Sequence, residues 1–132
     1  MKLQNVAIMA VPMSLAWTAA AVSAEPDATK WLSLVDAGHY AQSWAGAGVL
    51  FKSHITAADW ESKVKPVRAP LGAVISRSPG AEKEMSQLPG APDGDYKIVT
   101  FNTRFANKAA AVETVVLARE SAGWKVDGYF IK

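Results

Sequence analysis

From residue 25 onward, apolar side chains recur first at helical spacing and later at strand spacing. The first such segment predicts a helix that opens at Pro26 and stops at Gly38, because proline fits a first turn and glycine fits the position just beyond the last one. Its inner face consists of residues spaced i, i+3, i+4 and i+7, namely Ala28, Trp31, Leu32 and Val35.

Two more helices are predicted before residue 70. One runs from about His39 to Gly48. The next begins with a capping sequence at Thr56 and ends near Arg68, because a following proline pushes Ala69 toward extended geometry. The apolar residues on their inner stripes are Tyr40, Trp44 and Ala47 in the former, and Trp60, Val64 and Val67 in the latter.

Alternation with a period of two begins after Pro70 and predicts four strands. The first covers residues 71–76 and is ended by Ser78-Pro79-Gly80. A turn region rich in proline and glycine follows at 88–94, and the other strands span 95–105, 109–120 and 124–131. The short connections between these last three strands predict antiparallel hairpins.

The register of the central hairpin is predicted by keeping one face apolar. A two-residue turn at Asn107-Lys108 places Phe101 opposite Thr114, whereas a longer turn would place Phe101 opposite Glu113, so the pattern favours the shorter turn. A three-residue loop at 121–123 then assigns the last strand. Its apolar face would carry Trp124, Val126 and Phe130, and its other face Lys125, Asp127 and Tyr129.

The order of elements predicts an α+β domain in which three N-terminal helices pack on a curved four-stranded antiparallel sheet. This arrangement is similar to the cystatin-like or nuclear-transport-factor-2-like (NTF2-like) cone. In that cone a strongly bent sheet wraps helices and often leaves a pocket.

The N-terminal segment has the pattern of an export signal. Lys2 precedes an apolar stretch from Val6 to Trp17, and small residues end at Ala24. We therefore expect residues 1–24 to be a signal peptide cut after Ala24, and residues 25–132 to form a single periplasmic or secreted domain without stable membrane insertion. An uncleaved membrane anchor is the alternative, since residues 6–24 are almost long enough to span a bilayer.

Composition narrows the classes of function. The chain has 132 residues with 14 Lys and Arg against 12 Asp and Glu, so we expect no nucleic-acid binding through a strong positive field. It has no cysteine, which excludes disulfides, cysteine-ligated zinc, iron–sulfur clusters and a thiol nucleophile. Its two histidines, His39 and His54, lack a convergent set of ligands, so we predict neither a metal nor a cofactor.

Candidate binding residues fall into two groups. Arg68 and Arg77 are candidates to present planar guanidinium groups to an anionic ligand or partner, although Arg68 also fits a purely structural corner. The second group is a polar surface expected on the outer face of the sheet, for which an exposed ion pair is the simpler interpretation. Its members are Asn102, Arg104, Glu113, Asp127 and Tyr129.

Several stretches resemble the bacterial family catalogued as Domain of Unknown Function 4019. The most specific is Arg68-Ala69-Pro70-Leu71-Gly72-Ala73-Val74, followed by Ser76-Arg77; others are residues 31–38, 88–96 and 123–130. The resemblance covers about the whole chain after the signal. It implies a small exported or envelope-associated domain, and it implies no catalytic residue.

Taken together, these features favour a non-enzymatic module that binds an unknown small molecule or envelope protein in the bacterial periplasm or envelope. The alternative is a cone-fold enzyme using Glu113 or Asp127 as a general acid or base. The helix-facing strand positions are expected to be apolar except for Thr103 and Thr114, which counts against catalysis. A carboxylate in a deep pocket with a strongly raised pKa would favour the enzyme. A structural accessory of an envelope complex is a third hypothesis.

Overall fold

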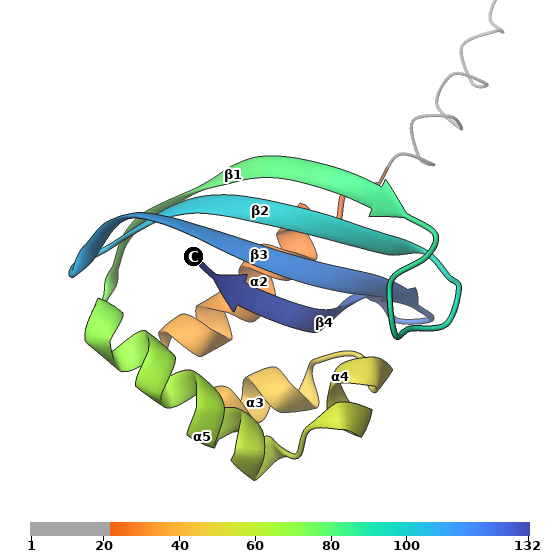
Figure 1. Ribbon diagram of the computed structural model, residues 1–132, viewed down its shortest axis with the longest axis horizontal. Helices are drawn as coiled ribbons and strands as arrows, with labels where there is room; N and C mark the ends of the chain where they lie inside the picture. The colour runs from red at the N-terminus through yellow and green to blue at the C-terminus, as the bar shows by residue number, and fades with distance from the viewer. Residues whose placement is uncertain (1–21) are drawn as a thin grey trace, which may run out of the picture.

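The computed structural model describes residues 22–132, so most of the expected signal, residues 1–21, lies outside the described part. Within this described part, four helices precede the strands: α2 (Glu25–Asp36), α3 (Tyr40–Ala45), α4 (Val49–His54) and α5 (Ala57–Arg68). A 3-10 turn, η2 (Ala69–Leu71), leads into β1 (Val74–Met85), β2 (Tyr96–Phe105), β3 (Lys108–Glu120) and β4 (Gly123–Ile131). The α+β class is confirmed (Figure 1). None of the helices described over 22–132 has the length and apolar character needed to cross a bilayer.

The two long helices form where the local pattern predicts them. In α2 the four expected residues are buried, and Gly38 follows with a φ of 77°. At the start of α5, the Thr56 hydroxyl accepts a hydrogen bond from the backbone N–H of Asp59. The inner stripe of α5 differs at one position, because Val67 is 51% exposed and Arg68 is buried instead.

Two predicted details of the helical half were wrong. The predicted second helix is shorter, and α4 was not predicted at all; the glycines at 46 and 48 separate α3 from α4. Ala69 is helical rather than extended, because Pro70 lies in the first turn of η2, where it needs no N–H partner. The helical conformation ends at Gly72 instead, whose φ of 79° is one that glycine adopts readily.

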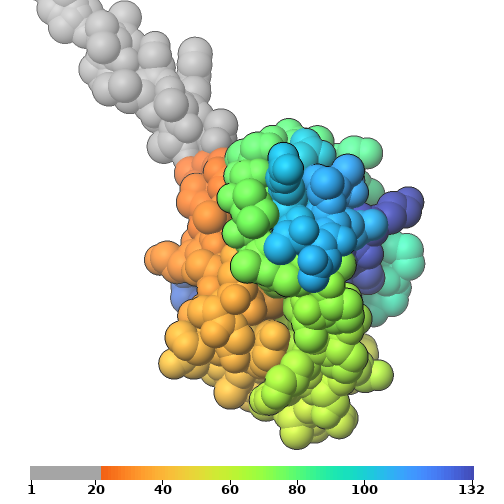
Figure 2. Space-filling model, turned by 90° about the vertical axis from the view of Figure 1, so that its left-hand side faces the viewer, coloured from red at the N-terminus to blue at the C-terminus, as the bar shows by residue number. Residues whose placement is uncertain are grey.

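The strands form one antiparallel sheet in the order β1-β2-β3-β4. β1 begins later than predicted and does not stop at Pro79; it continues to Met85 through a register shift between Pro79 and Glu82. Proline is compatible with this position because β1 is an edge strand, where an N–H can be missing without breaking the ladder. The tip of the β2–β3 hairpin is fixed to the start of β1, where the Ala106 N–H donates to the carbonyl of Ala73. Figure 2 faces this end of the molecule, with the hairpin tip (blue) beside β1 and α5 (green).

The predicted register of the central hairpin was wrong by one residue. Phe101 pairs with Glu113, and Thr103 pairs with Ala111. Because side chains alternate between faces, this shift turns Glu113 toward the helices, where it is completely buried. An irregularity between Thr103 and Phe105 allows a tight turn at residues 106–107 to coexist with this register.

A second irregularity, between Val116 and Leu117, changes the face assignment along β4. Val126 and Tyr129 both contact the core, whereas Phe130, expected to be buried, is 61% exposed. The last hairpin also has a shorter loop than predicted, since Glu120 pairs with Gly123.

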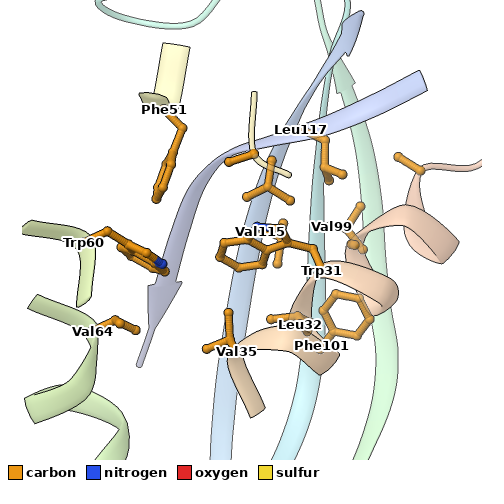
Figure 3. Packing of buried hydrophobic residues seen from close by; sticks show 14 residues of the cluster. Trp31, Leu32, Val35, Phe51, Trp60, Val64, Val99, Phe101, Val115 and Leu117 are labelled. Carbon is orange, nitrogen blue, oxygen red and sulfur yellow. The ribbon is translucent and has the colours of Figure 1, made fainter. Parts of the chain in front are cut away.

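The hydrophobic core is one cluster to which residues of α2, α4 and α5 and of β2, β3 and β4 contribute (Figures 1 and 3). The Trp31 ring of α2 packs against the rings of Trp60 in α5 and Phe51 in α4, with centroid distances of 5.8 and 6.3 Å. The indole N–H groups of Trp31 and Trp60 both donate to Ser43, which is buried in α3. This one serine therefore ties three helices together without leaving a buried donor unpaired.

Candidate functional site

Four of the seven predicted site residues come together inside the domain, in a group that we call the buried charge cluster. Arg68 from α5, Arg77 from β1, Glu113 from β3 and Tyr129 from β4 belong to it. Two further members were not predicted to be part of a site: Asp36, the last residue of α2, and Thr103 of β2. The cluster lies where the end of α2, the end of α5 and the sheet meet.

Asp36 joins the two arginines of the cluster. The Arg77 guanidinium binds both Asp36 oxygens, with N–O distances of 2.7 and 3.0 Å, in the forked geometry typical of arginine and carboxylate. Arg68 donates to the same carboxylate at 2.8 Å. Burial alone would raise the pKa of Asp36, but the hydrogen bonds from Arg77 and Arg68 outweigh it and lower the pKa below its usual value.

Glu113 is the most deeply buried carboxylate of the cluster. Its Oε1 accepts from Arg77 Nε at 2.7 Å and from the Thr103 hydroxyl at 2.6 Å, and its Oε2 accepts from the Tyr129 hydroxyl. Burial, followed by the neighbouring charge of Glu113, raises the pKa of Tyr129, so the phenol stays protonated and donates. These partners explain why the wrong register was predicted: a glutamate was treated as incompatible with the core, but here its charge and hydrogen bonds are satisfied.

The cluster balances its own charges. Two guanidinium groups face two carboxylates, and the Arg68 guanidinium also lies 5.0 Å from the Phe105 ring centroid. Burial alone would lower the pKa of Arg77, but the hydrogen bonds that it donates to Asp36 and Glu113 outweigh burial and raise that pKa. Because the guanidinium groups of Arg68 and Arg77 are both engaged by the protein's own carboxylates, the cluster holds the end of α2 and the end of α5 against the sheet.

The other three predicted site residues lie elsewhere. Asn102 and Arg104 are exposed, on the face of β2 opposite to Phe101 and Thr103. Asp127 lies in the irregular part of β4, beside α4. The predicted polar surface is therefore divided between the core, the outer face of the sheet and the neighbourhood of α4.

Asp127 and Glu120 hold the first turn of α4. The Phe51 N–H donates to Asp127 Oδ1 at 3.1 Å, and the Val49 N–H donates to Glu120 Oε2 at 2.9 Å. The chain approaches these carboxylates closely at Gly48, where an added Cβ would lie 2.2 Å from Asp127 Oδ1. The acceptors for α4 thus come from β3 and β4 rather than from a local capping residue.

An open pocket of about 370 Å³ adjoins this contact, and we call it the α4 groove. Its lining is mainly apolar and comes chiefly from three segments, to which β2 adds Tyr96 and β3 adds Val116. Leu50, Phe51, His54 and Ile55 belong to α4 and its end, Leu88 and Ala91 to the β1–β2 loop, and Asp127, Gly128 and Phe130 to β4.

Asp127 is the carboxylate of the α4 groove. Its Oδ2 is buried and has no hydrogen-bond partner among residues 22–132. Burial, reinforced by the nearby charge of Glu120, raises the pKa of Asp127, although the Phe51 N–H and His54 act in the opposite direction. The groove therefore combines mainly apolar walls with one carboxylate, Asp127, that has an unpaired oxygen.

The two cluster residues missed from the sequence leave different traces in it. Asp36 is an acidic residue in the last turn of α2, where the helix dipole disfavours negative charge, and that anomaly is a signal of a cationic partner. Thr103 occupies an inward position in an otherwise apolar alternation of β2 and was identified there as a polar exception. Neither signal identifies Arg77 as the partner of these residues. The first strand was predicted to end at residue 76, so Arg77 was not placed in the sheet beside Thr103.

No candidate metal site appears among the residues that the structure describes, in the sense of three or more clustered His, Cys, Asp or Glu side chains. His39 precedes α3, while His54 ends α4 and its Nδ1 lies 2.8 Å from the Leu50 carbonyl oxygen. The two histidines thus belong to different local structures.

Comparison with known proteins gives one match. The model of a family described as "Protein of unknown function (DUF4019)" matches residues 27–129, which include every element from α2 to β4 in whole or in large part. No curated protein and no solved structure matches the chain.

Proposed function

This chain belongs to the DUF4019 family of proteins of unknown function, and we propose that it is a non-enzymatic binding module. The proposed binding site is the α4 groove. The proposed ligand is a small apolar molecule that carries an amine or ammonium group. The observation that carries this proposal is that Asp127 lines the groove and that its buried Oδ2 has no partner within residues 22–132. An unpaired buried acceptor is unfavourable, so a ligand that donates to it gains affinity.

The shape and lining of the groove support an apolar ligand. Small-molecule sites combine mostly apolar walls with a few well-placed polar groups, and the volume of about 370 Å³ lies within their usual range. Phe130 is 61% exposed at the edge of the groove, so a bound apolar chain would remove part of its surface from water.

Asp127 supports the cationic part of the proposed ligand. Burial raises its pKa because the carboxylate form is poorly solvated, and an ammonium group placed beside it would offset that effect. We expect affinity for an ammonium ligand to fall as the pH falls through the pKa of Asp127, since protonation removes the attracting charge.

The proposal is tested by calorimetric titration of the protein with alkylammonium ions of increasing chain length, and with the matching alcohols. Affinity for the ammonium series is expected to rise with chain length and to fall about tenfold in Asp127→Asn, which corresponds to about 1.4 kcal/mol. Asparagine can still accept from the Phe51 N–H, so α4 should remain in place. Asp93→Asn, which makes the same charge change on an exposed loop, is the control. Equal affinities in both variants would refute the proposal.

An enzyme is the second candidate, and one observation favours it: the groove carboxylate, Asp127, has a raised pKa. A carboxylate of this kind can act as a general acid or base. Glu113, the other carboxylate considered from the sequence, is instead engaged by Arg77, Thr103 and Tyr129. Recovery of a bound ligand chemically unchanged after long incubation supports the binding module, while a converted product supports the enzyme.

The fold and the location complete the proposal. We propose that the sheet and helices form a cystatin-like or NTF2-like cone, supported by the core that α2, α4 and α5 share with β2, β3 and β4. We also propose that the domain is exported to the bacterial periplasm or envelope, supported by the apolar and small-residue pattern of the N-terminal segment.

A further inference from the structure

The three residues before α2 are built into the folded domain. Ala24 is completely buried and belongs to the hydrophobic core. Its carbonyl accepts the first hydrogen bond of α2, from the Ala28 N–H at 3.0 Å, and its own N–H donates to Glu82 Oε2 at 3.0 Å. Ala24 thus connects the start of α2 to β1.

Val22 and Ser23 make further contacts with the sheet. The Ser23 hydroxyl donates to Glu82 Oε1 at 2.7 Å. Lys97, buried at the start of β2, donates to the Val22 carbonyl at 2.7 Å and lies 3.1 Å from Glu82 Oε2. A buried ammonium group needs such acceptors, so these residues help to satisfy Lys97.

A cut after Ala24 would remove all of these contacts. Lys97 would lose the Val22 carbonyl, Glu82 would lose two donors, and the core would lose the methyl group of Ala24. The cut would also create a positive ammonium group at Glu25, in the first turn of α2, where the helix dipole disfavours positive charge.

We propose that export processing cuts the chain between Ala21 and Val22, so that the mature protein begins at Val22. Hydrolysis of this peptide bond consumes one water and leaves a carboxylate on Ala21 and an ammonium group on Val22. Small residues at the last and third-last positions, Ala21 and Ala19, satisfy the requirement of a signal peptidase. The proposal places the cut three residues before the one expected from the sequence.

The surroundings of Val22 fit a new N-terminus. Val22 is 58% exposed, so cleavage on its N-terminal side requires no opening of the core. It shares a small depression with two carboxylates, Glu84 and Asp95, and two cations, Lys97 and Arg119, so the new ammonium group would join a set of mixed charges at the surface. The proposal rests on the proposed export and is independent of the α4 groove.

The test expresses the full chain with its own N-terminus in a Gram-negative host and determines the N-terminal sequence and intact mass of the periplasmic protein. We expect a start at Val22. A start at Glu25, or at any other residue, would overturn the cleavage site while leaving export intact, whereas an intact Met1 terminus would overturn both.

A matched pair of variants tests the site independently. Ala19→Gln places a large side chain at the third-last position of the proposed cut, and Val22→Gln does the same for a cut after Ala24. We expect precursor to accumulate in Ala19→Gln and normal processing in Val22→Gln. Because the Val22 side chain is largely exposed, the latter should fold normally. The reverse pattern would contradict the proposal.

Discussion

Replacing Glu113 with leucine tests the buried charge cluster and the corrected register together. Glu113 is completely buried and accepts hydrogen bonds from Arg77, Thr103 and Tyr129. Leucine has similar bulk but no acceptor, so it leaves two hydroxyl groups unpaired and removes one of the two carboxylates that face Arg77.

The expected loss is large for a domain of this size. Breaking a buried ion pair by removing one partner destabilises a protein by about 3–5 kcal/mol. The total free energy of unfolding of a natural domain is about 5–15 kcal/mol. Arg77 keeps its contacts with Asp36, and we therefore expect Glu113→Leu to remain folded but with a free energy of unfolding lower by about 3 kcal/mol.

Urea denaturation followed by tryptophan fluorescence at neutral pH measures this loss. Glu61→Leu is the control, because Glu61 forms an exposed pair with Lys65 at 3.7 Å and such pairs contribute about 0–1 kcal/mol. In the double variant Arg77→Met/Glu113→Leu, the loss should be clearly smaller than the sum of the two single losses. A denaturation midpoint of Glu113→Leu equal to that of the wild type would show that Glu113 faces solvent, as the register with Phe101 opposite Thr114 requires.

Four further predictions concern other positions. Gly48→Ala should lower the free energy of unfolding by about 1–3 kcal/mol in chemical denaturation, because the added Cβ would lie 2.2 Å from Asp127 Oδ1. Gly46→Ala is the control: its Cβ would lie 3.5 Å from the nearest atom, the Gln42 carbonyl oxygen, so the change should be less than about 0.5 kcal/mol. The pKa of Asp36 is lowered in the folded state, so its ion pairs stabilise the fold fully above the unfolded-state pKa of about 3.9. This stabilisation is lost as the pH falls through the folded-state pKa. Acid titration should therefore destabilise the wild type more steeply than Asp36→Asn. Stability should fall in the order wild type, Arg68→Lys, Arg68→Ala, since lysine keeps the charge but lacks the planar group with which Arg68 donates to both Asp36 and Tyr129. A lysine variant with wild-type stability that loses a bound partner would instead place Arg68 in a recognition site. Trp124→Ala should cost less than the about 3–5 kcal/mol of a fully buried aromatic residue, because Trp124 is only partly buried, and an unchanged midpoint would show that it contributes no packing.

The parts of the fold predicted correctly are those decided by local pattern. The inner face of α2 follows from apolar spacing, and the start of α5 follows from a threonine whose partner is three residues away. The strands β2, β3 and β4 were located within a residue or two for the same reason, because alternation is visible within each segment.

The parts predicted wrongly depend on residues distant in sequence. α4 has no capping side chain of its own; its first turn is completed by Asp127 and Glu120, about 75 residues later. The register failed because Glu113 is neutralised by Arg77, and no pattern within β2 or β3 reveals that partner. The site was affected in the same way: Arg68 and Arg77 were identified from the sequence, but the carboxylate of Asp36 that joins them was not.

The proposal of an apolar, amine-binding groove is tested most directly by an NMR titration of the isotopically labelled protein with a medium-chain alkylammonium ion. We expect saturable shifts of backbone amides that concentrate at Leu50, Phe51, Ala91 and Gly128, the lining of the α4 groove, and that are largely lost in Asp127→Asn. Shifts that are absent, that spread over exposed sites such as Asn102 without saturation, or that persist unchanged in Asp127→Asn would contradict the proposal.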